Sequence, residues 1–219
     1  MFSGVDMILC WAAKGGSGTT VVAAALGLLS AAHRPTTLID LAGDLPAVLG
    51  VPAPTGPGVD DWLRSPTGSA DSLAGLAFGV VPGLCLVPAG SDGPLPSTHR
   101  LGALGALAVA IGELPSAIVD AGTGPPPLEL HELAHASLLV TRNCYLAIRR
   151  AQRSAIRPTG IVLLEEPGRG VRTRHVEASL DAPVVAELLV DPSVARAVDA
   201  GLLLTRLPRS LGSPLRDVA

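Results

Sequence analysis

Short apolar runs alternate with longer stretches of helical periodicity along most of this 219-residue chain. The apolar runs are almost continuously hydrophobic, which is typical of strands in a parallel sheet that helices cover on both faces. Seven strands are predicted on this basis, at residues 7–12, 36–40, 84–88, 117–120, 137–141, 159–164 and 184–189.

Helices are predicted after most of these strands, and their ranges are residues 20–32, 98–112, 128–135, 146–156 and 192–200. The alternation of strands with helices predicts an α/β fold with a doubly wound, mainly parallel sheet and helices on both faces. We expect a single domain of this kind over residues 1–208.

The segments at residues 51–70 and 209–219 depart from this alternation. The first is rich in Pro, Gly, Ser and Thr, so we expect a surface excursion with one short helix at residues 60–64, which Trp62 anchors to the domain. In the second, two prolines in or next to the segment predict a flexible C-terminal tail. They also exclude a regular amphipathic helix that could target a membrane.

Composition narrows the class of protein. Apolar residues make up 48% of the chain and charged residues 16%, which favours a packed core over disorder. Cys10, Cys85 and Cys144 are odd in number and lack metal-ligand spacing, so we expect reduced thiols and a cytoplasmic location. The longest apolar run, at residues 101–114, is shorter than the roughly 20 residues that cross a bilayer, so no transmembrane segment is predicted.

A glycine-rich loop, Lys14-Gly15-Gly16-Ser17-Gly18-Thr19-Thr20, follows the first predicted strand and opens the first predicted helix. In this order, backbone N–H groups converge on an anion, and the positive end of the helix dipole adds to the attraction. A P-loop usually carries lysine directly before its last Thr or Ser, but here Thr19 stands at that position and Lys14 is the only lysine in the chain. The loop is therefore predicted to cradle phosphate without its main charge.

This loop resembles the deviant Walker A motif of the ParA/MinD family of P-loop ATPases. The resemblance extends over nearly the whole chain: residues 38–45 are similar to the family's second strand and acidic motif, 84–90 to its strand ending in Pro-Ala, 118–122 to its Walker B strand, 138–141 to the next strand and 191–201 to its closing segment. Among family members, the atypical CpaE/TadZ-like proteins are the most similar in character.

The resemblance implies a P-loop NTPase fold, a homodimer, and a site for ATP and Mg²⁺. It implies that Lys14 reaches the phosphates bound by the partner subunit, that the Thr20 hydroxyl ligates Mg²⁺, and that Asp120 lies behind the metal. The residues that it implies in nucleotide binding are Lys14, Gly15, Gly16, Ser17, Gly18, Thr19, Thr20, Asp40 and Asp120.

Three positions depart from the family pattern. Thr19 replaces the P-loop lysine, Ala42 replaces the carboxylate that positions the attacking water, and Glu165-Glu166 stands where many members offer an asparagine to the base. Asp44, two positions after Ala42, is a candidate catalytic substitute. A charge-assisted hydrogen bond contributes about 1.5–3 kcal/mol, so the loss of the lysine alone weakens nucleotide binding roughly ten- to hundred-fold.

These departures predict weak or absent ATP hydrolysis, because a missing cation and a missing water-positioning acid affect the transition state more than the bound state. The expected role is that of a positioning or scaffolding factor in a septum, pole, pilus-assembly or partitioning system, with a protein partner. The alternative is an active ATPase that dimerises on ATP.

Basic residues concentrate between residues 142 and 175, where eight arginines and two glutamates give a local charge of +6. Arg149, Arg153 and Arg157 recur at helical spacing, with Arg150 beside them, and predict one basic helix face. A solvated surface is the simpler interpretation. The alternative is contact with nucleic acid, an anionic membrane surface or an acidic partner.

A second motif points to a different class of protein. His131, Glu132 and His135 match H-E-x-x-H, in which two imidazoles on one helix face bind zinc and the glutamate acts as base. Three prolines precede the motif and a predicted strand follows it closely, so little more than two helical turns are available. No clear third ligand follows, although His175 or Glu165 could serve. A surface helix is therefore expected, with a zinc hydrolase as the remote alternative.

Overall fold

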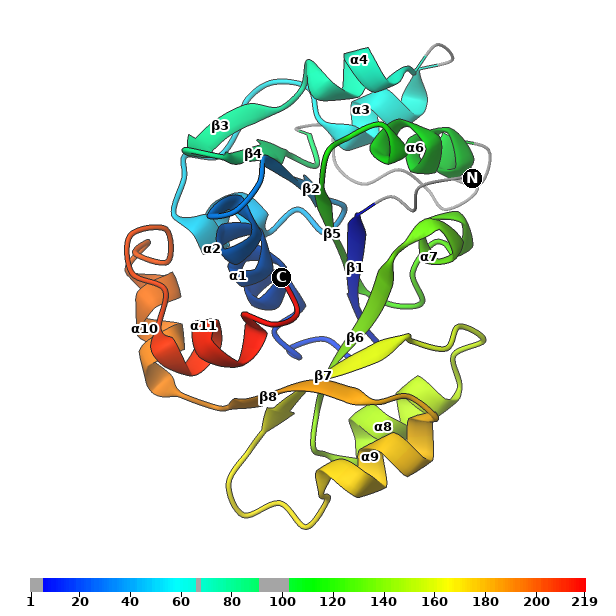
Figure 1. Ribbon diagram of the computed structural model, residues 1–219, viewed down its shortest axis with the longest axis vertical. Coiled ribbons are helices and arrows are strands. Elements are labelled where there is room, and N and C mark those ends of the chain that lie inside the picture. Colours follow the sequence, from blue (N-terminus) through cyan, green and yellow to red (C-terminus); the bar gives the residue numbers. More distant parts are fainter. Residues whose placement is uncertain (1–5, 66–67, 91–102) are drawn as a thin grey trace.

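The computed structural model describes residues 6–65, 68–90 and 103–219, which form a domain around an eight-stranded sheet (Figure 1). The strand order is β3-β4-β2-β5-β1-β6-β7-β8, and every neighbouring pair is parallel except β3 and β4. The strands are β1 (Met7–Ala12), β2 (Thr36–Asp40), β3 (Phe78–Val81), β4 (Leu84–Val87), β5 (Ala117–Thr123), β6 (Ala136–Arg142), β7 (Gly160–Glu165) and β8 (Val184–Leu189). The predicted doubly wound α/β fold is confirmed.

β1 lies near the middle of the sheet, and all of its residues are apolar and buried. It pairs in parallel with β5 on one side and with β6 on the other. Its side chains alternate between two core layers, with Leu9 and Trp11 in one layer and Ile8 and Cys10 in the other. The buried Trp11 donates a hydrogen bond from Nε1 to Oγ of Ser137 on β6 at 3.1 Å, which satisfies the one polar group of its side chain.

Helices cover both faces of the sheet, as Figure 1 shows. One face carries α1 (Thr19–Ala31), α2 (Leu45–Leu49), α10 (Pro192–Asp199) and α11 (Arg209–Leu215). The other face carries α3 (Val59–Arg64), α4 (Ala70–Ala74), α6 (Ala103–Gly112), α7 (Leu128–Leu133), α8 (Tyr145–Gln152) and α9 (Thr173–Leu180). In the described part of the chain, no helix combines the length and the apolar character that crossing a bilayer requires.

Several short elements of the structure are absent from the prediction. β3 is only partly buried, and it forms an antiparallel edge with β4. α9 buries only Val176 and Leu180, which leaves little hydrophobic periodicity to detect. The helix predicted at residues 98–112 is observed from Ala103, and the first five of those residues lie outside the described part of the chain.

The predicted basic helix face is shorter in the structure. α8 ends at Gln152, Arg153 is its C-cap, and Arg157 lies beyond the helix. The helix itself therefore carries only Arg149 and Arg150, because the chain turns away after two turns and breaks the helical spacing that the sequence suggests. The guanidinium of Arg149 lies 5.8 Å from the centroid of the Tyr145 ring, within the range of a cation–π interaction.

The excursion at residues 51–70 contains the expected short helix, which is α3. Trp62 on this helix is 5% exposed, and its indole Nε1 donates hydrogen bonds to Oγ of Ser72 at 2.8 Å and to the carbonyl of Ser69 at 3.1 Å. The backbone of the excursion also lies against the end of β4, since the N–H of Val59 donates to the carbonyl of Pro88 at 2.8 Å. Trp62 thus anchors the excursion as the sequence predicts.

The C-terminal segment is not the flexible tail that its prolines predict. Residues 209–215 form α11, which contacts α1 and β8 and buries Leu211 and Leu215. Pro208 is the N-cap of α11, where a missing N–H costs nothing, and Pro214 falls in the last turn, where it removes only one hydrogen bond. Burial of the two leucines outweighs that loss.

Replacing Leu215 with alanine is expected to lower the free energy of unfolding by about 2–4 kcal/mol, because a fully buried leucine leaves a cavity when truncated. The neighbouring Arg216 is exposed, so Arg216→Ala should change it by less than about 0.5 kcal/mol. Urea denaturation of both variants measures the difference. Equal midpoints for the two variants would show that the C-terminal segment adds nothing to stability.

Candidate functional site

The glycine-rich loop connects the C-terminal end of β1 to the first turn of α1. Gly16 and Gly18 have φ values of +75° and +85°, a left-handed conformation that glycine adopts without strain. Gly18 is the N-cap of α1, and neither a capping side chain nor an acidic residue occupies that end of the helix. The first N–H groups of α1 therefore remain available to an anion, and the helix dipole favours negative charge there.

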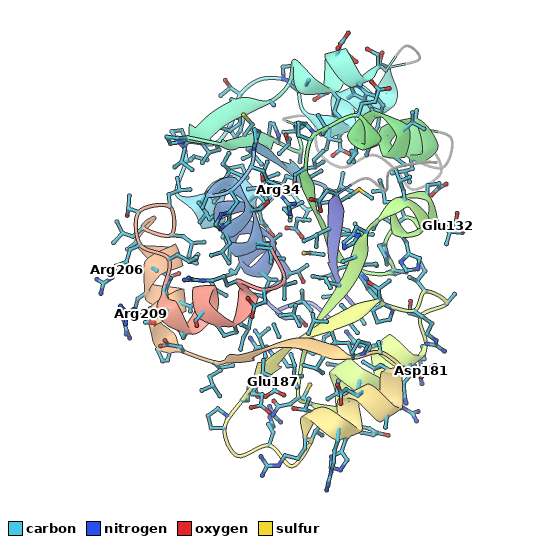
Figure 2. All side chains as sticks on the ribbon, viewed as in Figure 1. Arg34, Glu132, Asp181, Glu187, Arg206 and Arg209 are labelled. Carbon is cyan, nitrogen blue, oxygen red and sulfur yellow. The ribbon has the colours of Figure 1, made fainter. Side chains whose placement is uncertain are left out.

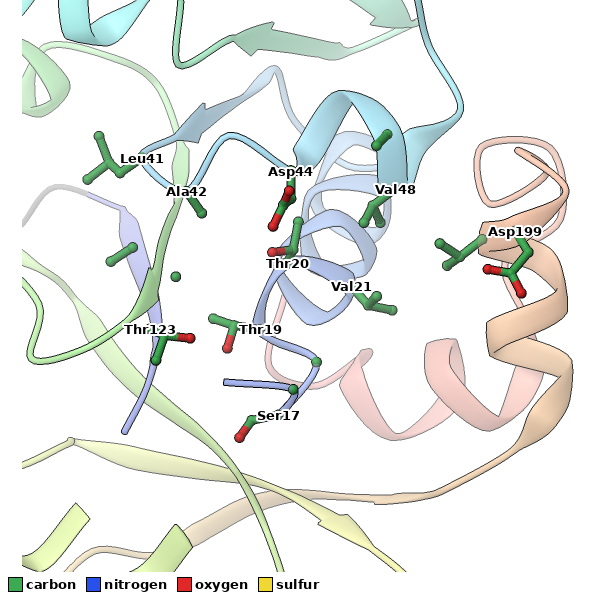
Figure 3. Close-up of a pocket in the computed structure, with 16 residues that line it drawn as sticks. Ser17, Thr19, Thr20, Val21, Leu41, Ala42, Asp44, Val48, Thr123 and Asp199 are labelled. Carbon is green, nitrogen blue, oxygen red and sulfur yellow. The ribbon is translucent and has the colours of Figure 1, made fainter. Parts of the chain in front are cut away.

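A cavity of about 820 Å³, which we call the phosphate-loop cavity, opens in front of this loop (Figure 3). It lies at the carboxyl ends of the parallel strands, next to the central strand from which successive strands are added on either side, where open α/β sheets bind ligands. Its walls are the loop, the end of β5, the segment after β2, and the helices α2 and α10. The lining residues are Gly16, Ser17, Gly18, Thr19, Thr20, Val21, Leu41, Ala42, Asp44, Ala47, Val48, Ala121, Gly122, Thr123, Val198 and Asp199.

The two helices that close the cavity, α2 and α10, meet just beyond their C-terminal ends. Gly50 is the C-cap of α2, and Gly201 follows α10; both have positive φ values, of +72° and +64°. A Cβ on Gly50 would lie 2.5 Å from the carbonyl oxygen of Gly201, so the backbones can meet this closely only because residue 50 has no side chain.

The charges that line the cavity are negative. Asp44 and Asp199 are its two ionisable residues, and none of the lining residues, all of them described, is Lys, Arg or His. Lys14 does not line the cavity, and its Nζ donates to the carbonyl of its neighbour Gly15 at 3.3 Å. Thr19 lines the cavity at the position of the usual P-loop lysine and is 6% exposed. The cavity thus offers backbone N–H groups and hydroxyls but no cationic side chain of its own.

Asp120 is completely buried beneath this cavity. Its Oδ1 accepts a hydrogen bond from the N–H of Gly122 at 3.0 Å, while its Oδ2 has no hydrogen-bond partner among the described residues. The pKa of Asp120 is raised to about 6, mainly because the carboxyl is buried. Hydrogen bonding to the Thr20 side chain and the Gly122 N–H lowers the pKa, while the charges of Asp40 and Asp44 raise it. The unpartnered oxygen is free to accept a hydrogen bond or a cation.

Thr20 and Asp120 fit the predicted Mg²⁺ site. The hydroxyl of Thr20 lies at the cavity wall and close enough to Asp120 to lower the pKa of that carboxyl. Hydroxyl and carboxylate oxygens are ligands that Mg²⁺ prefers, and Mg²⁺ in such sites also keeps water and phosphate ligands. Because Oδ2 of Asp120 has no hydrogen-bond partner among the described residues, it can accept a hydrogen bond from a water molecule bound to Mg²⁺ or contact the ion directly.

Asp40 has a structural role in the fold. Its Oδ1 accepts hydrogen bonds from the N–H groups of Ala42 at 3.1 Å and Gly43 at 2.6 Å, and its Oδ2 accepts one from Leu45 at 3.0 Å. Burial raises the pKa of Asp40, and these three N–H groups oppose the rise. Asp40 does not line the phosphate-loop cavity; it holds the segment that brings Ala42 and Asp44 to the cavity wall.

The structure brings together most of the predicted site residues, and it adds residues that the motifs do not include. Ser17, Gly16, Gly18, Thr19, Thr20 and Asp44 line the cavity, Asp120 lies beneath it, and Lys14, Gly15 and Asp40 are not among its lining residues. Thr123, Val48 and Asp199 complete the walls. Asp199 belongs to the segment that resembles the family's closing segment, but only the packing of α10 places it opposite the loop (Figure 3).

Glu166, which follows the end of β7, lies outside the cavity and is occupied by two arginines. Arg142 and Arg169 donate to its two carboxylate oxygens, with N–O distances of 2.5 Å and 2.6 Å, and hydrogen bonds from these groups lower the pKa of Glu166. The side chain of Asn143 accepts from the N–H of Glu166 at 2.9 Å. Glu166 of the Glu165-Glu166 pair is thus part of a local ion-pair network with Arg142 and Arg169.

The H-E-x-x-H segment does not form a metal site. α7 ends at Leu133, and Ala134 is its C-cap in an extended conformation, so His135 leaves the helix on which His131 lies. The short connection to β6 forces this early end, and the two imidazoles lose the common helical face that zinc binding requires. In the described ranges, no group of three or more His, Cys, Asp or Glu side chains is arranged to hold a metal ion.

Asp120→Asn tests the electrostatics of the site through pH. Because folding raises the pKa of Asp120 from 3.8 to about 6, its favourable contribution to stability is complete below pH 3.8 and is lost as pH rises to about 6. The variant should therefore gain stability relative to wild type by about 2–3 kcal/mol between pH 4 and pH 7. Urea denaturation at each pH measures this, with the exposed Asp217→Asn as control; a difference that does not vary with pH would contradict the assignment.

No protein-family model matches the sequence, and no curated protein is significantly similar to it. Solved structures are similar at the level of the fold. A ParA family ATPase from Chlorobium tepidum TLS has a TM-score of 0.76 and 17% sequence identity over 98% of this chain and 97% of that one.

Two further solved structures are similar over nearly their whole length. The septum site-determining protein MinD from Pyrococcus horikoshii OT3, complexed with Mg-ADP, has a TM-score of 0.75 and 16% identity over 98% of this chain and 94% of that one. A MinC:MinD cell division complex from Aquifex aeolicus has a TM-score of 0.75 and 16% identity over 97% and 93% of the two chains. The chain therefore has the fold of the ParA and MinD P-loop ATPases.

Proposed function

We propose that this chain is a ParA/MinD-type positioning or scaffolding factor that binds Mg-ATP weakly and hydrolyses it slowly or not at all. The observation that carries the proposal is the charge of the cavity: Asp44 and Asp199 line it, and Thr19 stands where a P-loop lysine would meet the phosphates. The retained parts, which are the loop, Thr20 and Asp120, support descent from a nucleotide-binding site.

The charges around the cavity determine how strongly it binds a polyphosphate. A polyphosphate that enters this cavity meets backbone N–H groups at the start of α1, and any neutralisation of its charge must come from Mg²⁺ held near Thr20 and Asp120. Lys14, which would reach the partner subunit's phosphates in a nucleotide-bound dimer, donates to the carbonyl of Gly15. Weak, Mg²⁺-dependent binding follows from a cavity with these groups.

The water-positioning acid is the second missing part. Ala42 lines the cavity at the position of that acid, and its Cβ lies 3.0 Å from the place that a Cβ on Gly122 would occupy. Asp44, the N-cap of α2, also lines the cavity. Its carboxylate is therefore a candidate to replace, in part, the missing acid that positions the attacking water. A competent ATPase that dimerises on ATP is the second candidate, because the glycine loop, Thr20 and Asp120 are all in place.

The cellular role follows the fold by analogy. Similar structures include proteins of septum placement and cell division, one of them solved with the partner MinC. We place this chain with the CpaE/TadZ-like members of the family, as a cytoplasmic homodimer that acts through a protein partner and associates with membrane or nucleoid only peripherally.

Calorimetric titration of the wild-type chain with ATP and Mg²⁺ tests the proposal, with phosphate release measured on the same sample. The expected dissociation constant is millimolar or weaker, and Lys14→Ala should not change it. Micromolar affinity with steady phosphate release would contradict the proposal and favour the active ATPase.

Thr19→Lys is expected to restore the missing charge and to strengthen Mg-ATP binding about ten- to hundred-fold, since one charge-assisted hydrogen bond contributes about 1.5–3 kcal/mol. The cavity in front of Thr19 has room for the longer side chain. Thr19→Gln is the control for size without charge. Equal affinities for the lysine and glutamine variants would show that the charge at this position is not what limits binding.

Ala42→Asp is expected to affect turnover rather than affinity. In the Thr19→Lys background, the added carboxylate should raise the rate of phosphate release at least about tenfold, because a water-positioning group acts in the transition state. Ala42→Asn keeps the size and removes the charge. If the aspartate and asparagine variants release phosphate at the same rate, residue 42 is not the position from which the attacking water is activated.

A further inference from the structure

A second cavity, of about 640 Å³, lies between α10 and α11. Three arginines from consecutive segments line it, Arg196 on α10, Arg206 in the connection and Arg209 at the start of α11. Apolar residues complete the lining, and we call this feature the arginine cleft. Its apolar lining residues are Ala197, Leu202, Leu207 and Pro208.

Some arginines elsewhere in the described part of the chain have acidic partners. Arg34 pairs with Asp6, and Arg142 and Arg169 both pair with Glu166. The guanidinium groups of Arg206 and Arg209, by contrast, form no hydrogen bond or ion pair with any described residue. They are exposed, and Figure 2 shows both at the edge of the molecule beside α10 and α11. Their charge is thus available to a partner.

The one carboxylate in the arginine cleft is already satisfied from within the fold. Asp191 accepts hydrogen bonds from the N–H and hydroxyl of Ser193 at 2.7 and 2.6 Å and from the hydroxyl of Ser210 at 2.6 Å. These hydrogen bonds from Ser193 and Ser210 lower the pKa of Asp191, and the positive charge of nearby Arg196 lowers it slightly further. This network ties α10 to α11 and leaves the cleft with an excess of positive charge.

The backbone holds the cleft in a defined shape. The N–H of Arg206 donates to the carbonyl of Leu202 at 2.9 Å, and the N–H of Gly212 donates to the carbonyl of Pro208 at 2.9 Å. The arginines therefore project from a hydrogen-bonded turn and a helix rather than from an irregular loop, so a ligand orders their side chains without also having to order the backbone.

We propose that the arginine cleft binds an acidic peptide segment of a protein partner. A small anion would gain little from exposed guanidinium groups, because water screens them. A peptide that alternates acidic and apolar side chains can reach all three arginines and also cover the apolar lining, and arginine is enriched at such interfaces. Nucleic acid offers the charge but no aliphatic side chains for that lining.

The site is separate from the proposed nucleotide function. The arginine cleft shares no lining residue with the phosphate-loop cavity, although α10 contributes to both. Peptide binding is therefore expected without nucleotide, and its failure would leave the proposed weak Mg-ATP binding untouched.

Fluorescence anisotropy with a labelled peptide of repeated Asp-Glu-Leu units tests the proposal on the full chain at low ionic strength. Arg206→Gln combined with Arg209→Gln should weaken binding at least about tenfold. The matched control is Arg149→Gln combined with Arg150→Gln, which removes the same charge from α8 and should change binding less than about twofold. Thermal unfolding of both double variants verifies that the fold is retained.

Several results would overturn the proposal. These are the absence of saturable peptide binding by the wild-type chain up to about 1 mM, equal losses in the two double variants, and equal binding of an Asn-Gln-Leu peptide. Displacement of the peptide by inorganic phosphate at the same concentration would show a simple anion site instead. A short DNA duplex that binds more tightly than the peptide and depends on Arg206 and Arg209 would assign the cleft to nucleic acid.

Discussion

The backbone pairing of β1 is the constraint on which the rest of this structure depends. The strand is buried along its whole length and is paired on both edges, so the chain can leave it only at the carboxyl edge of the sheet. The glycine-rich loop must therefore turn there, and α1 must run back along one face. The parallel register also sets Asp120 of β5 beside Cys10 of β1 and Asp40 of β2, directly below the loop. The site is a consequence of strand order.

The sequence predicts those parts of the fold that follow from apolar runs or from a motif of fixed spacing. β1 follows an unbroken apolar run, β2 and β8 follow apolar runs that polar residues interrupt, and the loop after β1 follows the spacing of a glycine-rich phosphate loop. The errors have physical causes. The prolines near α11 predict a flexible tail, because the sequence does not show that α11 packs against α1 and β8 and buries Leu215. Arg157 continues the helical spacing of Arg149 and Arg153, but spacing alone cannot show that α8 ends at Gln152. Asp199 and Val48 reach the site only through the packing of whole helices.

The two buried carboxylates near the candidate site, Asp40 and Asp120, differ in their hydrogen-bond partners. Asp40 and Asp120 are neighbours on adjacent strands, but three N–H groups satisfy Asp40, whereas Asp120 keeps one oxygen without a described partner. The first arrangement fixes the segment after β2, and the second leaves a carboxylate oxygen available to a ligand. Sequence motifs treat both as acids at strand ends, and only the hydrogen-bond geometry distinguishes their roles.

The contact between Gly50 and Gly201 has a consequence for the width of the phosphate-loop cavity. The backbones of these residues meet where α2 and α10 end, so the distance between the two walls is set at a point that contributes no group to the lining. Any side chain at residue 50 would push the helices apart and widen the cavity while every lining residue stayed the same. Cavity size and cavity chemistry are thus under the control of different residues, and each can change without the other.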